Sequence, residues 1–197
     1  MWNYFNPVEI IFGENRFKEV HDALKNKNYI IITHPEEIFK KYSDELKSSS
    51  NPPLSIMTDV QPNPDYKDIL ELQKKFSSIN ESVDYILAIG GGSVTDTAKA
   101  IAAFKDKQEY LTDFVRNKKN PRVENPIKII AIPTTSGTSS ELTCWATIWD
   151  KEKNKCFAGF TVSGNNVGVD ESITISGEAL SFLSTGIDTR VYFIKNF

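Results

Sequence analysis

Short runs of apolar, mostly β-branched residues alternate with amphipathic segments along the first two thirds of the chain. The apolar runs lie at residues 8–12, 29–33, 54–57, 85–89 and 127–132. Helical patterns lie between them, near residues 36–48, 65–79 and 93–104. A continuous apolar run is typical of a strand buried on both faces, and segments of this length suit βαβ crossovers. The pattern therefore predicts an α/β fold with a doubly wound, mainly parallel sheet.

The pattern weakens after about residue 150. A charged turn occupies residues 151–155, and apolar stretches at 157–162 and 167–169 predict additional strands or a flap. A short helical pattern follows at 178–183, and residues 189–197 show no clear pattern. We therefore expect one α/β domain over residues 1–180.

Composition narrows the class of protein. Of the 197 residues, 40% are hydrophobic and 25% are charged, which is enough apolar material for the core of one such domain. The net charge of -3 and the scattered lysines give no basic face, so nucleic acid is not expected as a partner. Cys144 and Cys156 lack metal or disulfide spacing, and no apolar run reaches the length of a membrane span. We expect a cytoplasmic protein with no membrane partner.

Three consecutive glycines, Gly90 to Gly92, join a predicted strand to a predicted helix and are followed by Ser93. Glycines let backbone N–H groups approach an anion closely, and a helix N-terminus adds a partial positive charge. The segment lacks the Gly-Lys-Ser/Thr of a Walker motif, and Thr95 stands where the Rossmann fingerprint has its last glycine. It predicts a phosphate site, with a tight strand-to-helix turn as the alternative.

A second polar segment, residues 132–143, directly follows another predicted strand. Seven of its residues carry hydroxyl groups, which donate to and accept from a ribose or a diphosphate. The alternative is an ordinary loop in which Ser139 or Ser140 caps a helix. Two polar loops at the carboxyl ends of parallel strands form the crevice in which open α/β sheets bind ligands, and this position favours a binding site.

Together the two segments resemble the iron-containing (group III) alcohol dehydrogenases. That family carries Gly-Gly-Gly-Ser-x-x-Asp-x-Ala-Lys followed by Pro-Thr-Thr-x-Gly-Thr-x-Ser-Glu, and both motifs occur here without gaps, at residues 90–99 and 133–141. The resemblance runs from Phe12-Gly13 through Pro62-Asn63-Pro64 to residues 170–174 and 185–188. It implies a Rossmann-like, dehydroquinate synthase-like fold and NAD(P)-dependent conversion of a small alcohol or aldehyde. Residues 145–150 are similar to members that reduce small aldehydes, including phosphonoacetaldehyde.

By this resemblance, residues of both motifs would contact the cofactor. Gly91, Gly92 and Ser93 would hold its diphosphate. Hydroxyl groups would line the path of the adenosine and the nicotinamide ribose, namely those of Thr134, Thr135, Thr138 and Thr143. Asp96 would anchor the start of the helix near the phosphate turn, and its favourable interaction with the helix dipole is an equally good account of that residue.

The end of the strand at residues 29–33 bears on the choice between NAD and NADP. Family members selective for NAD usually carry an acidic residue there, which accepts from the ribose 2′-hydroxyl. This chain has Thr33 and His34 instead, so a 2′-phosphate would meet no repulsion and His34 would partly neutralise it. NADP is therefore expected at least as readily as NAD, with an exposed loop histidine as the alternative for His34.

The family's metal site is matched at one position. Its members bind Fe²⁺ or Zn²⁺ through an aspartate, a histidine four residues later and two further histidines in a helical C-terminal domain. Here Asp188 matches the aspartate, Tyr192 stands four residues later, and both histidines of the chain precede residue 35. We expect residues 181–197 to be the start of a truncated helical metal-binding domain, and this chain not to hold the metal.

Two classes of function follow from these features. The first is an oxidoreductase for a small alcohol or aldehyde, catalytically impaired because most metal ligands are missing. The second is a non-catalytic dinucleotide-binding module or remnant, whose apolar face is left open to association. A homodimer is one assembly compatible with the sequence.

Overall fold

The computed structural model describes residues 8–12, 16–117, 123, 125–135, 137, 139–143, 145–153, 155–158 and 173–176. Six strands form one sheet: β1 (Glu9–Phe12), β2 (Tyr29–Thr33), β3 (Ser55–Met57), β4 (Tyr85–Gly90), β5 (Lys128–Pro133) and β8 (Ile173–Ser176). Their order is β1-β8-β5-β4-β2-β3, and every neighbouring pair is parallel. The prediction of a doubly wound, parallel, Rossmann-like sheet is confirmed.

Helices connect the strands. They are α1 (Glu19–Ala23), α2 (Glu37–Lys47), α3 (Tyr66–Ser77), α4 (Gly92–Phe104) and α5 (Gln108–Asn117). Asp65 caps α3, because its side chain accepts a hydrogen bond of 2.9 Å from the Lys67 N–H. The helices predicted near residues 36–48, 65–79 and 93–104 are therefore present as α2, α3 and α4.

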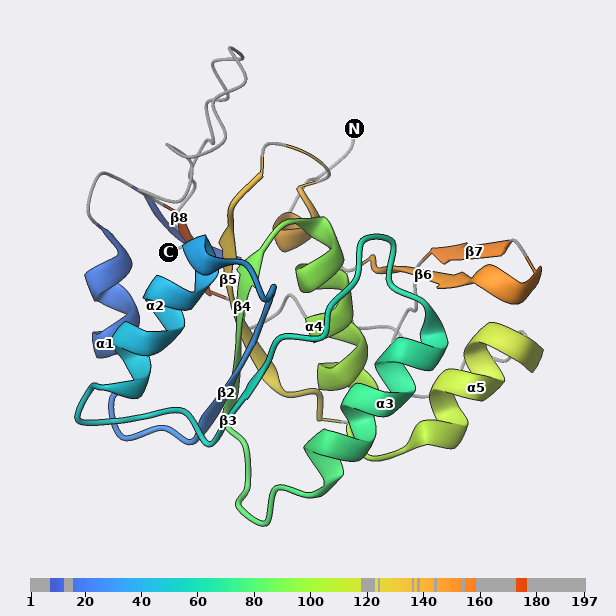
Figure 1. Cartoon of the computed structure of the whole chain (residues 1–197), viewed down its shortest axis with the longest axis horizontal. Coiled ribbons are helices and arrows are strands. Elements are labelled where there is room, and N and C mark those ends of the chain that lie inside the picture. The colour runs from blue at the N-terminus through green and yellow to red at the C-terminus, as the bar shows by residue number, and fades with distance from the viewer. Residues whose placement is uncertain are drawn as a thin grey trace, which may run out of the picture.

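The order of the strands reverses between β2 and β4. From β2 the chain runs outward to the edge strand β3, then returns past β2 to form β4 and β5. Helices α1 and α2 cover one face of the sheet, and α3, α4 and α5 cover the other (Figure 1). Open α/β sheets bind ligands beyond the carboxyl ends of the strands at such a reversal, so the fold indicates where a site belongs.

Alternate residues of each strand enter two separate cores. In β2, Ile30 and Ile32 pack in the core under α3 and α4, whereas Tyr29 and Ile31 pack in the core under α1 and α2. This is why the strands appear in the sequence as continuous apolar runs.

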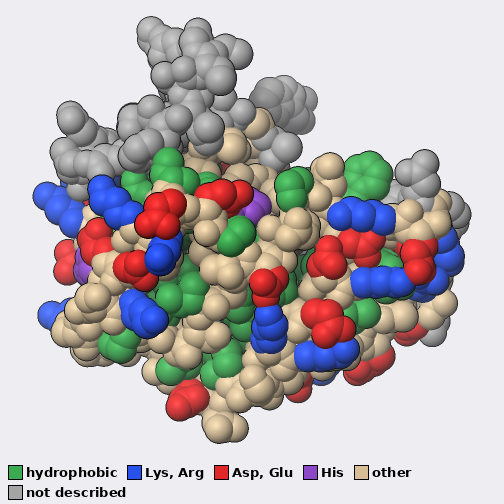
Figure 2. Space-filling model, viewed as in Figure 1, with side chains coloured by type: hydrophobic (Ala, Val, Ile, Leu, Met, Phe, Trp, Pro, Cys, Tyr) green, Lys and Arg blue, Asp and Glu red, His purple; other side chains and the backbone are tan. Residues whose placement is uncertain are grey.

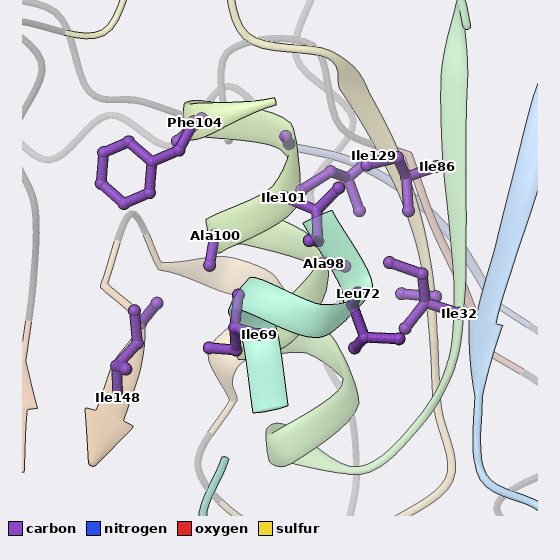
Figure 3. Close-up of a cluster of buried hydrophobic side chains, with 14 of the residues drawn as sticks. Ile32, Ile69, Leu72, Ile86, Ala98, Ala100, Ile101, Phe104, Ile129 and Ile148 are labelled. Carbon is purple, nitrogen blue, oxygen red and sulfur yellow. The ribbon is translucent and has the colours of Figure 1, made fainter. Parts of the chain in front are cut away.

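Helix α4 lies deep in the first core. Ile101 points toward Ile86 and Ile129 of the sheet, while Ala100 points the other way, on the side of Ile148 (Figure 3). A helix that is covered on both sides is held rigidly, and its polar residues must find partners within the protein.

A two-stranded antiparallel hairpin, β6 (Thr147–Asp150) and β7 (Lys155–Ala158), lies beside α3 and α5. Arg116 of α5 forms an ion pair of 3.2 Å with the fully buried Asp150 and lies 4.9 Å from the centre of the Tyr66 ring. The Trp149 N–H donates to the Pro64 carbonyl at 2.9 Å. These contacts attach the segment after residue 145 to the main domain.

Several elements differ from the sequence-based expectation. Helix α5 and strands β6 and β8 were not predicted, and the charged turn at residues 151–155 is a 3-10 helix (Lys151–Lys153) followed by the start of β7. The stretches at 167–169 and 178–183 lie outside the described residues.

The surface carries mixed charge on the side seen in Figure 2, where Lys and Arg side chains are interleaved with Asp and Glu. Within the described ranges, no helix combines the length and apolar character that a membrane span requires.

Candidate nucleotide-binding site

The loops that follow β2, β3, β4 and β5 meet at the carboxyl edge of the sheet. A Cβ placed on Gly90 would lie 3.4 Å from His34 Cδ2, and one placed on Gly91 would lie 2.9 Å from Thr135 Oγ1. The Asn63 N–H donates to Ser93 Oγ at 3.2 Å. The segments after β2, β3 and β5 thus each lie against the glycine turn after β4, at the point where the strand order reverses.

Close packing explains the glycines of the turn. A Cβ on Gly90 would lie only 2.5 Å from Val94 Cγ2, so a side chain there would push α4 away from β4. The Gly91 carbonyl accepts from the Val94 and Thr95 N–H groups at 3.1 and 3.2 Å, which starts α4 at Gly92. The first N–H groups of a helix have no partner within it, so those of Gly92 and Ser93 face the region beyond the sheet edge.

The hydroxyl-rich loop begins beside this turn. The Thr134 N–H donates to the Gly90 carbonyl at 3.0 Å, extending the pairing of β4 and β5. Thr134 Oγ1 is buried and has no hydrogen-bond partner among the described residues, while Thr135 is exposed. The Thr143 hydroxyl donates to the Ser140 carbonyl at 3.3 Å, and Thr138 lies outside the described residues.

The two serines proposed as helix caps have different surroundings. Ser139 adopts a left-handed conformation with φ of 50° before the short 3-10 helix Ser140–Leu142, and its side chain makes no capping hydrogen bond. Ser140 is buried and donates to Asp96 Oδ1 at 2.6 Å. Neither hydroxyl group therefore acts as a simple cap.

His34 lies at the end of β2 against the glycine turn. Its Nδ1 lies 3.2 Å from the Val60 carbonyl, which fixes Nδ1 as the donor of that hydrogen bond and leaves Nε2 for another partner. The ring packs 5.5 Å from Phe39, centre to centre. Thr33, in contrast, is fully buried and donates to the Ile89 carbonyl at 2.8 Å, so only His34 is available to a ligand.

Asp96 is turned into the protein. Its Oδ1 accepts from Ser140, and its Oδ2 accepts from the Thr147 N–H at 3.0 Å. Burial raises the pKa of Asp96 above its ordinary value, and the hydrogen bonds from Ser140 and Thr147 and the charge of Lys99 oppose that rise. Burial likewise raises the pKa of the neighbouring Glu141. Asp96 therefore joins the glycine-turn helix to the hydroxyl-rich loop.

Sequence reasoning assigned no role to Lys99 and only an alternative capping role to Ser140, although both belong to the two motifs. Lys99 Nζ donates to Ser140 Oγ at 2.9 Å and to the Trp145 carbonyl at 2.7 Å. Nothing in the linear pattern distinguishes a buried lysine from the solvated lysines elsewhere in the chain. The available signal was the three-residue spacing of Asp96 and Lys99, which puts two opposite charges on one face of a helix made otherwise of small, hydroxyl-bearing and apolar residues.

The metal site cannot be placed in this part of the chain. Asp188 and Tyr192 lie outside the described residues, and the described residues contain no group of three or more His, Cys, Asp or Glu side chains that could hold a metal ion. His21 is on α1, where its Nε2 lies 3.2 Å from Glu45 Oε1 on the surface.

The chain is thus an α/β domain with a parallel sheet. Its glycine turn lies against the hydroxyl-rich loop at the point where the strand order reverses. The family model described as iron-containing alcohol dehydrogenase matches residues 7–164, and the chain belongs to this family.

Known proteins similar to the chain include alcohol dehydrogenase 4 of Saccharomyces cerevisiae, 29% identical over 98% of this chain and 51% of that protein. Aldehyde-alcohol dehydrogenase 2 of Entamoeba histolytica is 31% identical over 94% of this chain and 23% of its own length. The crystal structure of sulfoacetaldehyde reductase from Bifidobacterium kashiwanohense with NAD⁺ superposes with a TM-score of 0.76 at 25% identity, covering 93% of this chain and 48% of that one. The chain thus spans about half the length, or less, of these relatives.

Proposed function

We propose that this chain binds an NAD(P) dinucleotide at the carboxyl edge of its sheet and belongs to an oxidoreductase acting on a small alcohol or aldehyde. The observation that carries the proposal is the contact of the glycine turn with the hydroxyl-rich loop at the strand reversal. The family to which the chain belongs, and the NAD⁺ in the related sulfoacetaldehyde reductase, support the same chemistry.

The residues present fit a dinucleotide. The start of α4 offers N–H groups of Gly92 and Ser93 to a diphosphate, and the absence of a side chain at Gly91 leaves room beside Thr135. Thr134 Oγ1 retains unused hydrogen-bonding capacity next to the turn. Thr138 and Thr143 complete the proposed cofactor-binding residues as contacts to the riboses. Asp96 contributes through its hydrogen bond with Ser140, which attaches the hydroxyl-rich loop to α4.

A bound nicotinamide would supply or accept the hydride, and the protein would bind and orient it. In the family, a metal ion would polarise the alcohol or aldehyde oxygen, and Asp188 is the single matching ligand in this sequence. We propose that this chain by itself is catalytically impaired for that reason. The narrower resemblance to phosphonoacetaldehyde-reducing members, and a homodimeric state, remain predictions.

Titration with NADPH and NADH, followed by nicotinamide fluorescence, tests the proposal. The chain should bind at least one of them, and Gly92→Asp should abolish binding because it places a negative carboxylate at the diphosphate position. Asn80→Asp is the control, since it adds the same charge at an exposed residue beyond the opposite, amino edge of the sheet. Equal affinity of the parent and Gly92→Asp chains would refute the assignment of the diphosphate site.

The alternative function, a dinucleotide-binding module without turnover, shares this site. The oxidoreductase and the binding module both require dinucleotide binding. Only the oxidoreductase converts an alcohol or aldehyde, so an activity measurement distinguishes the two functions.

A further inference from the structure

Lys99 is a charged residue in the middle of the buried helix α4, with only 3% of its surface exposed. Its ammonium group donates to three acceptors in the segment after β5: the Ser140 carbonyl, Ser140 Oγ and the Trp145 carbonyl. An ammonium group has three N–H donors, so this set satisfies all of them. The side chain thereby holds two points of the segment against α4.

Asp96, one turn earlier on α4, holds the same segment through two other contacts. The Ser140 hydroxyl accepts from Lys99 and donates to Asp96 Oδ1 at 2.6 Å, so it links the two charged groups. Asp96 Oδ2 accepts from the Thr147 N–H at 3.0 Å. Residues 140, 145 and 147 are therefore attached to a helix whose own first residues form the glycine turn.

Two buried opposite charges that are linked through one hydroxyl group contribute little net stability, because removing both charges from water opposes their attraction. The contribution of these contacts is to geometry. The ammonium group of Lys99 and the carboxylate of Asp96 keep their hydrogen bonds only while residues 140, 145 and 147 lie in these positions against α4. We propose that Lys99, through Ser140 and with Asp96, is a positioning residue that sets residues 139–143 and 145–147 at a fixed distance from the glycine turn and so pre-forms the dinucleotide site. The inference rests on the proposed function for its ligand, but the positioning itself does not require the ligand.

Lys99→Met tests the positioning, because methionine keeps the length of the side chain and removes its three donors. Backbone hydrogen exchange of the ligand-free chain is measured first, and exchange in residues 139–147 should rise at least tenfold while exchange in β2 and α2 stays unchanged. The dissociation constant for NADPH or NADH should then rise at least tenfold, because the bound arrangement must be ordered on binding.

Gln73→Met is the matched control. Gln73 is also fully buried on a helix of the same core and donates to a backbone carbonyl, that of Lys105, at 2.9 Å. Its loss should lower stability, yet leave exchange in residues 139–147 and the dissociation constant unchanged. A general loss of stability would affect the two variants alike.

Ser140→Ala provides a second variant in case Lys99→Met does not fold. It removes the shared hydroxyl and leaves Lys99 its two carbonyl acceptors, so exchange and dissociation constant should change in the same direction by a smaller factor, and Ser140→Thr should restore both. Unchanged exchange in residues 139–147, or raised exchange with an unchanged dissociation constant, would overturn the inference. If the parent chain binds neither dinucleotide, the proposed function fails, and the exchange measurement still decides whether Lys99 holds the segment.

Discussion

Single residues at the carboxyl edge of the sheet divide into those that the proposed dinucleotide would contact and those whose side chains bond to groups inside the protein. His34 and Thr135 lie at the edge, whereas Thr33 and Asp96 bond to groups inside the protein. The division matters because only the first kind should change the choice of cofactor when mutated. The second kind should change stability and loop order.

His34→Asp should shift the preference from NADPH toward NADH by about tenfold, equivalent to roughly 1.4 kcal/mol. An aspartate at the end of β2 would repel a 2′-phosphate and accept from a ribose 2′-hydroxyl. The ratio of the two dissociation constants measures the shift. His34→Asn is the control that removes the imidazole without adding charge, and an unchanged ratio in His34→Asp would contradict the placement of the ribose beside His34.

Asp96→Asn should change how stability depends on pH. Burial raises the pKa of Asp96 in the folded chain above its model-peptide value of 3.8, so the folded state holds the proton more tightly than the unfolded state. The free energy of unfolding contributed by this group is therefore highest below pH 3.8 and falls as the pH rises through the raised pKa. Asparagine does not titrate and lacks this fall.

Urea denaturation of both chains at several pH values measures the difference. The stability of the parent minus that of Asp96→Asn should decrease as the pH rises from about 3 toward neutrality. A difference that increases over this range would show that the hydrogen bonds and Lys99 outweigh burial, and that the pKa is lowered.

At the scale of elements, the sequence was most informative where packing imposes a strict pattern. Strands β2, β4 and β5 are buried on both faces and therefore appear in the sequence as apolar runs. Helix α4 begins at Gly92, at the end of three consecutive glycines, and this run marks the turn between strand and helix. Helix α5 and strand β8 were missed because α5 follows α4 after only three residues and β8 depends on partners β1 and β5 far away in sequence. Long-range pairing of this kind leaves little local signal.

The candidate site shows the same limit. The glycine turn and the hydroxyl-rich loop could be predicted, because their residue types are unusual after a strand. The buried contact of Lys99 with Ser140 and Trp145 could not, since it joins residues 41 and 46 positions apart.

The junction of β4 and α4 provides a prediction at this scale. Gly90→Ala should destabilise the chain by about 1–3 kcal/mol, because the new methyl group would lie 2.5 Å from Val94 Cγ2. Val94→Ala removes that atom, so the double variant should lose less stability than the sum of the two single variants. Urea denaturation of the four chains gives the coupling, and strict additivity would show that β4 and α4 do not meet as described.

At the scale of the whole molecule, the chain covers the half of its relatives that contains the glycine turn and the hydroxyl-rich loop. The match to the family spans residues 7–164, and the chain corresponds to 51% of the Saccharomyces cerevisiae alcohol dehydrogenase 4 and 48% of the sulfoacetaldehyde reductase. The proposed dinucleotide site uses residues from several loops of this part of the chain. By the resemblance, metal-assisted hydride transfer would also need three histidines that have no counterpart in this sequence, so we expect the chain to bind the cofactor without converting a substrate.

The 197-residue chain, supplied with Fe²⁺ or Zn²⁺, NAD(P)H and small aldehydes, should therefore show no metal-dependent turnover. By the family resemblance, Asp188 is the single matching metal ligand in the sequence, and Tyr192 stands where the next histidine would be expected. Without a Lewis acid the developing alkoxide charge loses stabilisation worth several kcal/mol, and since each 1.36 kcal/mol is tenfold in rate, the loss is on the order of a thousandfold or more. Cofactor binding measured on the same sample distinguishes a missing metal site from a misfolded chain. Aldehyde reduction that a chelator abolishes and added metal restores would show that a complete site assembles, with ligands contributed by another chain or by residues that the family comparison does not assign.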